Sequence, residues 1–167
     1  DQAGIIDIRT ITNGLPLTEA KIEAIVESPL RIFSISVDAA TPESYKRLKG
    51  VDGFDKIVGL VRHAGQHKRK LGLDFPLLRV SYYPSPESAG EESRFIEIFR
   101  DLVDFIDIQE FKDIRHLGAH PLRSDCMMPF RRLAIFADGR VAPCCSLYSN
   151  KLIVGNIHRN SIKEIWD

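Results

Sequence analysis

Three cysteines are the residues of this sequence whose chemistry is most restricted. Cys144 and Cys145 are adjacent and directly follow the segment "DGRVAP", and Cys126 is the third cysteine of the chain. Three thiols complete neither a set of disulfides nor the CxxC pairs of a typical zinc site. In a reducing compartment such thiols serve as metal ligands, reactive groups or core residues, and the residue types alone leave these roles open.

The composition narrows the class of protein. The 167 residues include 23 basic and 23 acidic side chains, so the formal net charge is zero, which argues against a broad nucleic-acid-binding surface. No apolar run approaches the roughly 18 residues that span a bilayer, and no leader resembles a signal peptide. We therefore expect a cytoplasmic protein with no nucleic-acid or membrane partner. The chain lacks an initiating Met and starts almost at once with extended sequence, which indicates a fragment or a mature piece.

Extended and helical patterns alternate over the first part of the chain. Segments rich in β-branched residues occupy residues 5–12, 31–38, 77–83 and 105–110. Helical stretches lie between them, two of which open on the N-cap candidates Thr18 and Thr41. This alternation is typical of parallel βαβ units with right-handed crossovers. The sequence therefore predicts four parallel strands, adjacent in sequential order.

Each expected strand has one apolar and one polar face, because residues two apart share a face. The apolar faces suit covering helices. The polar faces carry side chains that need partners when buried, and they would line a ligand site in a barrel lumen: Ser34, Ser36, Asp38, Arg79, Ser81, Tyr83, Asp107 and Gln109. An open sheet with one solvated face is the alternative, although parallel sheets are rarely left uncovered.

The pattern changes near Lys112. Two short extended segments flank Asp138–Gly139, a strong hairpin signal, and a small helix follows Asn160 or Ser161, either of which could cap it. We therefore expect an α/β domain over residues 1–112 and a small cysteine-bearing β-hairpin domain over residues 113–167.

Three stretches of the sequence resemble a known family. They are "TNG" after the first strand, "SISVDAATPESYKRLKG" at the second, and "CMMPFRRLAIFADGRVAPCCSLYSNKLIVGNIHRNSIKEIW" at the end. Together they resemble radical S-adenosylmethionine enzymes with a SPASM or twitch-type C-terminal extension. The last stretch is the most specific, and the resemblance covers nearly the whole chain.

This resemblance implies a fold and two cofactors. Such enzymes have a partial (β/α)6 TIM barrel, in which a 4Fe–4S cluster held by a CxxxCxxC loop cleaves S-adenosylmethionine reductively. The resulting 5′-deoxyadenosyl radical abstracts hydrogen from the substrate. No CxxxCxxC occurs here, and the first strand corresponds to the third of the family barrel. We therefore expect a fragment that lacks the catalytic cluster and is inactive alone.

The resemblance also assigns the three thiols to an auxiliary iron–sulfur cluster. Such clusters favour about four thiolates, and a hairpin turning at Asp138–Gly139 would bring Cys126 and Cys144 close together. Cys145 should face away, because neighbouring strand residues point to opposite sides; it remains a further candidate ligand. Buried unligated cysteines or a zinc site are the alternatives.

Six polar residues are candidate contacts to S-adenosylmethionine or substrate. Ser36 and Asp38 resemble strand-end positions that contact the ribose or amino-acid part of the cofactor. Asn13, Arg79, Ser81 and Gln109 lie at or near the expected barrel mouth and lumen. Each has a structural alternative: a turn for Asn13, a helix cap for Asp38, and an ion pair of Arg79 with Asp38 or Asp107.

Two classes of function remain. The favoured one is a radical S-adenosylmethionine oxidoreductase or modifying enzyme, acting on a small molecule or a peptide. It would require an electron donor such as flavodoxin or ferredoxin. The alternative is a non-catalytic metal- or ligand-binding module built on a truncated barrel.

Overall fold

The chain forms two compact units in a computed structural model. The units comprise Asp1–Lys112 and Asp113–Asp167. The structure describes residues 7–110, 127–143 and 152–167. Each unit is described below by itself.

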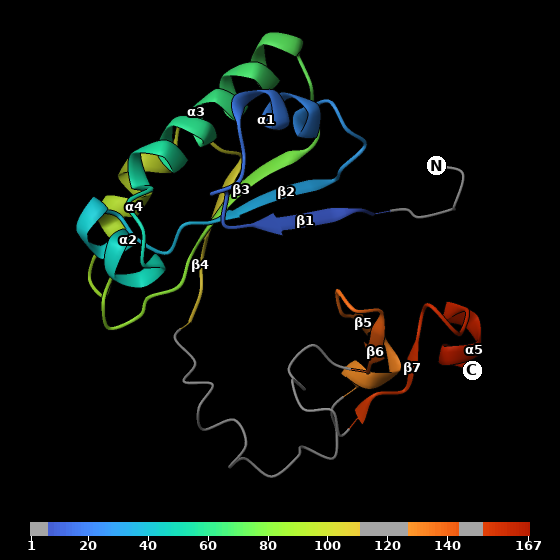
Figure 1. The fold of residues 1–167 in the computed structure, drawn as a ribbon. Coiled ribbons are helices and arrows are strands. Elements are labelled where there is room, and N and C mark those ends of the chain that lie inside the picture. Colours follow the sequence, from blue (N-terminus) through green and yellow to red (C-terminus); the bar gives the residue numbers. More distant parts are fainter. Residues whose placement is uncertain (1–6, 111–126, 144–151) are drawn as a thin grey trace. The chain divides into compact units, whose positions relative to one another are not determined.

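The first unit alternates strands and helices around a four-stranded sheet. Its elements in chain order are β1 (Arg9–Thr12), α1 (Glu19–Val26), β2 (Ile32–Ser36), α2 (Pro42–Lys49), α3 (Phe54–Leu71), β3 (Leu77–Tyr82), α4 (Glu92–Phe99) and β4 (Phe105–Ile108). The strand order is β1-β2-β3-β4, and all three pairings are parallel. The predicted α/β class and the predicted sequential order are therefore confirmed (Figure 1).

One face of the sheet packs against the helices. The buried strand residues Phe33, Ile35, Leu78 and Val80 belong to a single apolar cluster. The helices contribute Ile22 and Val26 from α1, Ile57 and Val61 from α3, and Phe95 and Phe99 from α4. This is the face that the alternation of residues assigned to the helices. The polar strand residues consequently point to the other side of the sheet.

Capping side chains set the helix boundaries where the sequence placed them. Thr18 accepts a hydrogen bond from the Lys21 amide at the start of α1, and Thr41 accepts one from the Ser44 amide at the start of α2. α2 ends at Gly50, whose φ of 75° requires the left-handed region. The two threonine caps therefore fix where α1 and α2 begin, and Gly50 fixes where α2 ends.

A half-buried carboxylate from a distant loop also holds the start of α2. Glu91 accepts hydrogen bonds from the Ala40 amide at 2.8 Å and the Ser44 hydroxyl at 2.7 Å, with the Thr41 hydroxyl at 3.4 Å. A carboxylate at a helix N-terminus is favoured by the exposed amides and the helix dipole. Glu91 therefore joins the β3–α4 loop to the β2–α2 loop.

We expect Glu91→Ala to lower the free energy of unfolding by about 2 kcal/mol, because it leaves these buried donors unpaired. Glu97→Ala, on the exposed side of α4, is the matched control and should change stability by less than about 0.5 kcal/mol. Urea melts of the two variants measure the difference. Equal stabilities would contradict the assigned role of Glu91.

The second unit contains a short antiparallel sheet and a helix. Its strands are β5 (Ala134–Ile135), β6 (Arg140–Ala142) and β7 (Gly155–Asn156), in the order β5-β6-β7. A short 3-10 helix, η2 (Met128–Phe130), precedes them, and α5 (Ile162–Trp166) follows. The predicted hairpin is confirmed: β5 and β6 pair antiparallel, and Gly139 turns the chain with a φ of 82°.

Local hydrogen bonds explain how this small unit holds its turns. Asp138 accepts from the Arg140 amide at 3.1 Å across the hairpin turn. Hydrogen bonds from Arg140 hold the pKa of the Asp138 carboxyl below its ordinary value. The cap of α5 is Ser161, which forms a reciprocal capping box with Glu164.

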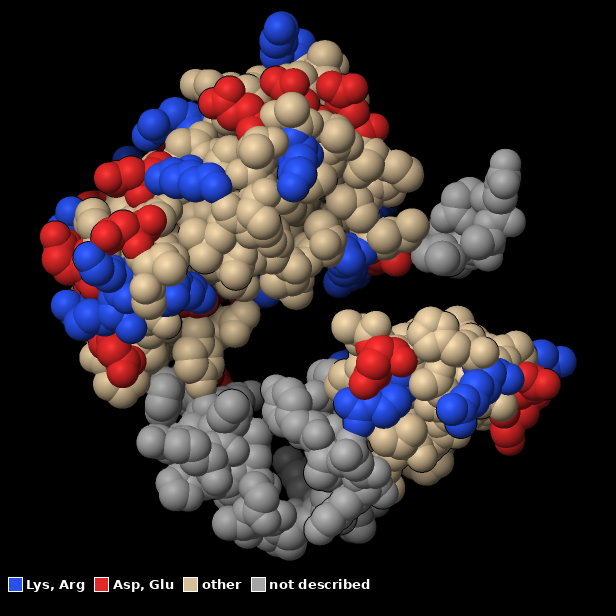
Figure 2. Space-filling view, in the orientation of Figure 1, with Lys and Arg blue, Asp and Glu red and all other residues tan. Residues whose placement is uncertain are grey.

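The charged surface and the helix lengths can both be compared with the sequence. On the face that Figure 2 shows, basic and acidic side chains are interspersed over the first unit. Within the described ranges, no helix is both long and apolar enough to cross a membrane.

Candidate ligand-binding site

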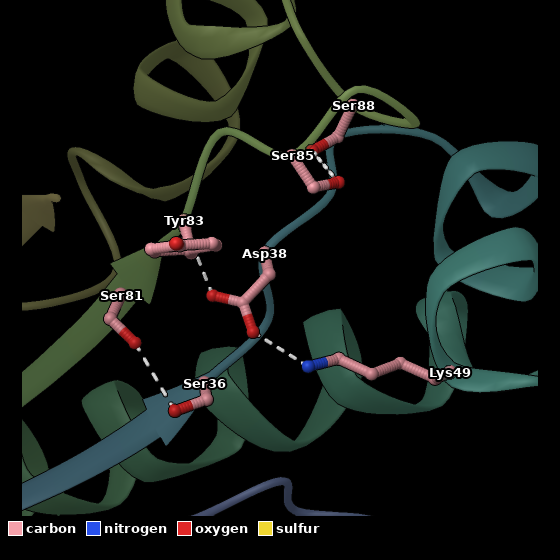
Figure 3. Close-up of polar contacts among 7 residues, drawn as sticks. All are labelled: Ser36, Asp38, Lys49, Ser81, Tyr83, Ser85 and Ser88. Carbon is pink, nitrogen blue, oxygen red and sulfur yellow. Dashed lines mark hydrogen bonds and ion pairs between the residues drawn. The ribbon is translucent and has the colours of Figure 1, made fainter. Parts of the chain in front are cut away.

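Two serines meet at the carboxyl ends of the central strands. Ser36 ends β2 and is the register partner of Ser81 on β3, and the Ser81 hydroxyl donates to the Ser36 hydroxyl at 3.2 Å (Figure 3). The prediction that both side chains share one face is therefore confirmed. In α/β folds with parallel strands, ligands bind at the carboxyl edge, so this hydroxyl pair is the centre of the candidate site.

Asp38 lies just beyond β2 in an unusual backbone conformation. Its φ of 64° is the only positive value among the described non-glycine residues. The Asp38 Oδ1 accepts from the Tyr83 amide at 3.1 Å, and Oδ2 forms an ion pair with Lys49 Nζ at 2.6 Å (Figure 3). The alternative of a helix cap is wrong, because Thr41 caps α2.

Arg79 and Gln109 both turn toward Asp107. Arg79 Nη2 donates to Asp107 Oδ2, and Gln109 Nε2 donates to the same oxygen at 3.0 Å. Of the two carboxylates that the sequence offered to Arg79, the structure therefore shows Asp107 as the partner. The charge of Arg79 is compensated on the polar face, so this arginine is a weaker candidate for clamping an anionic ligand than a free guanidinium would be.

Two polar groups on the same face retain hydrogen-bonding capacity. The Ser34 hydroxyl and Arg79 Nε are buried and have no hydrogen-bond partner among the described residues. They belong to register partners on β2 and β3, and only 1% of Ser34 is exposed. Because buried polar groups in native proteins are almost always paired, these two donors indicate a place for a polar ligand atom or an ordered water.

Asn13 follows β1 at the same edge, but its side-chain oxygen is hydrogen-bonded to the backbone. Its Oδ1 accepts from the Leu15 amide at 3.1 Å, and Gly14 follows with a φ of 77°. The turn that was the structural alternative for Asn13 is therefore present. The side chain is exposed, and its amide nitrogen is a potential hydrogen-bond donor.

A buried tyrosine lies beside the carboxylate of Asp38. The Tyr45 hydroxyl, on α2, is buried without a partner among the described residues. Burial raises the pKa of Tyr45 above its ordinary value, and the negative charge of Asp38 adds to the shift. Tyr45 therefore stays a neutral phenol at physiological pH and supplies no charge to the site.

Three contributors were not among the six candidate contacts named from the sequence: Lys49, the Tyr83 amide and the Ser34 hydroxyl. The alternation of faces placed Ser34 and Tyr83 on the polar side of their strands, but nothing in the sequence singled them out there. No sequence signal marked Lys49, which lies in the last turn of a charged helix.

The predicted cluster ligands Cys126, Cys144 and Cys145 lie outside the described residues. In the ranges that are described, no group of three or more His, Cys, Asp or Glu residues could hold a metal ion. The structure thus leaves the assignment of the thiols as a prediction.

Comparison with known proteins adds independent information on both units. Residues 126–167, which include all three cysteines, match the SPASM family model, described as an iron–sulfur cluster-binding domain. A search of curated proteins gives no significant match.

The fold as a whole is similar to that of SuiB from Streptococcus suis, in its crystal structure bound to S-adenosylmethionine. The TM-score is 0.69 at 11% sequence identity, and the match covers 96% of this chain and 47% of SuiB. The chain thus spans about half the length of SuiB. Both comparisons confirm the resemblance that the motifs predicted: a SPASM-like C-terminal region, joined to an α/β region whose fold is shared with a protein solved with S-adenosylmethionine.

Proposed function

We propose that this chain is part of a radical S-adenosylmethionine enzyme. In this proposal residues 1–112 form part of a partial (β/α)6 barrel, and residues 113–167 begin an auxiliary iron–sulfur domain. The observation that carries the proposal is the match of residues 126–167 to an iron–sulfur cluster-binding domain. The shared fold with a protein solved with S-adenosylmethionine supports it.

The carboxyl edge of the sheet would bind S-adenosylmethionine. The neighbouring hydroxyls of Ser36 and Ser81 can each donate and accept, as the hydroxyls of a ribose require. Asn13 and Gln109 lie on loops at the ends of β1 and β4 and would contact the cofactor or the substrate. When bound, the cluster and S-adenosylmethionine supply a 5′-deoxyadenosyl radical for hydrogen abstraction.

Two of the three cysteines would hold the auxiliary cluster. Cys126 and Cys144 are the proposed ligands, and Cys145 is the further candidate. Since their side chains lie outside the described residues, we assign no geometry to the cluster. The enzyme would oxidise or modify a small molecule or a peptide. Its electrons would come from a flavodoxin or a ferredoxin.

Calorimetric titration of S-adenosylmethionine into the product of the complete reading frame tests the edge site. We expect Ser36→Ala and Ser81→Ala each to raise the dissociation constant about fivefold, because a lost hydrogen bond is worth roughly 1 kcal/mol. Ser93→Ala, on the exposed side of α4, is the control and should bind like the wild type.

The outcome that overturns the proposal is equally specific. If the wild-type protein, reconstituted anaerobically with iron and sulfide, binds no S-adenosylmethionine, the proposed function is wrong. If it binds but neither serine variant is weakened, the cofactor lies elsewhere than at the Ser36–Ser81 edge.

A further inference from the structure

We propose that Lys49 is a positioning residue of this site: by holding Asp38, it fixes the ends of β2 and β3 on which the cofactor would rest. The inference rests on the proposed function for its ligand. It reassigns Asp38 from a direct ligand contact to a residue that shapes the edge.

The first support is the backbone of Asp38. Its φ of 64° lies in the left-handed region, which costs a residue with a Cβ about 1 kcal/mol or more. Such a conformation persists when surrounding contacts compensate for it. The contacts of the Asp38 carboxylate are the compensation that the structure offers.

The second support is the pattern of hydrogen bonds around Asp38. The amides of Val37 and Asp38 both donate to the Ser81 carbonyl at 3.2 Å. The Asp38 carboxylate then accepts from the Tyr83 amide at 3.1 Å. These bonds continue the ladder between β2 and β3 past the last paired residues, Ser36 and Ser81, with a side chain in place of a backbone carbonyl.

The third support is the environment of the ion pair with Lys49. The side chains of Lys49 and Asp38 are 22% and 17% exposed. Lys46, on the same helix, pairs with Asp52 beyond the helix end, and these two side chains are 61% and 75% exposed. Because shielding from water strengthens a charge pair and makes the loss of one partner costly, Lys49 should matter where Lys46 does not.

These contacts also explain the reassignment of Asp38. Each carboxylate oxygen already has a protein partner, one a cation and one a backbone amide (Figure 3). Without Lys49, Asp38 would keep a mostly buried charge that has lost its cation, and its strained backbone would relax. The hydroxyls of Ser36 and Ser81 are attached to the same strand ends, so their distance from each other would then change.

The inference is tested by measuring the dissociation constant of S-adenosylmethionine for the product of the complete reading frame. The variants compared with the wild type are Lys49→Met, Lys49→Arg and Lys46→Met. We expect Lys49→Met to raise the dissociation constant about tenfold, as loss of one partner of a shielded pair predicts. Lys49→Arg should restore it to within about twofold, since the cation is kept. Lys46→Met should bind like the wild type.

A purely structural Lys49 gives a different result: Lys49→Met then lowers the melting temperature but leaves the dissociation constant, measured well below melting, unchanged. An unchanged dissociation constant overturns the inference, whether or not the melting temperature falls.

A second readout separates this inference from the proposed function. Hydrogen exchange of the Tyr83 amide needs no ligand. If the wild-type protein binds no S-adenosylmethionine, the proposed function fails on its own. Faster exchange of the Tyr83 amide in Lys49→Met than in Lys46→Met then still supports the role of Lys49 at this edge, and equal exchange overturns it.

Discussion

Replacing either Cys126 or Cys144 with alanine should abolish the auxiliary cluster of the complete protein. Iron–sulfur clusters are held by about four thiolates, so the loss of one ligand exposes an iron to solvent and oxygen. After anaerobic reconstitution we expect each variant to contain roughly four fewer iron atoms than the wild type, the content of one 4Fe–4S cluster. Iron and sulfide analysis, together with visible absorption spectra, measures the loss.

Cys145→Ala is the matched control for this experiment. Adjacent residues of an extended segment point to opposite sides, so a thiol next to a ligand is expected to face away from the cluster. The variant should keep the iron content and the spectrum of the wild type. If Cys126→Ala and Cys144→Ala both retain them as well, the ligand assignment within the SPASM-like region is wrong.

The order and direction of the strands could be predicted from the sequence because they follow from two short-range periods. Alternation with period two placed Phe33 and Ile35 on one face of β2 and Ser34 and Ser36 on the other, and the core contains the first pair. Alternation of strands with helices implied parallel neighbours. The meeting of Ser36 and Ser81 then needed only equal register along two parallel strands.

The partners of the charged residues could not be predicted in the same way. Arg79 had two carboxylates within plausible reach, and the choice of Asp107 depends on the register between β3 and β4. Asp38 turns into its contacts because its backbone adopts a left-handed conformation. Such a conformation is uncommon for aspartate and leaves no pattern in the sequence around it.

The sequence also could not show which glycines within helices make close contacts. A glycine inside a helical pattern costs stability relative to alanine, so it indicates either a tolerated weakness or a close contact. α3 contains one glycine of each kind. A Cβ on Gly65 would collide with the Leu102 carbonyl oxygen, whereas a Cβ on Gly59 would meet no atom within 4 Å.

The close approach at Gly65 seats α3 against the segment that leads from α4 into β4. Leu102 lies three residues before β4, so the backbone contact at Gly65 helps to place the strand that carries Asp107. A methyl group here would meet rigid backbone rather than a flexible side-chain end. The helix or the loop would have to shift.

We therefore expect Gly65→Ala and Gly59→Ala to change stability in opposite directions. Gly65→Ala should lower the free energy of unfolding by about 2 kcal/mol, since the cost of overpacking exceeds the gain in helix propensity. Gly59→Ala gains that propensity at an open position and should raise it by roughly 0.5–1 kcal/mol. Urea unfolding of both variants, followed by circular dichroism, measures the two shifts. Increased stability in both variants would show that α3 does not approach the Leu102 carbonyl as closely as described, because helix propensity alone would then account for both glycines.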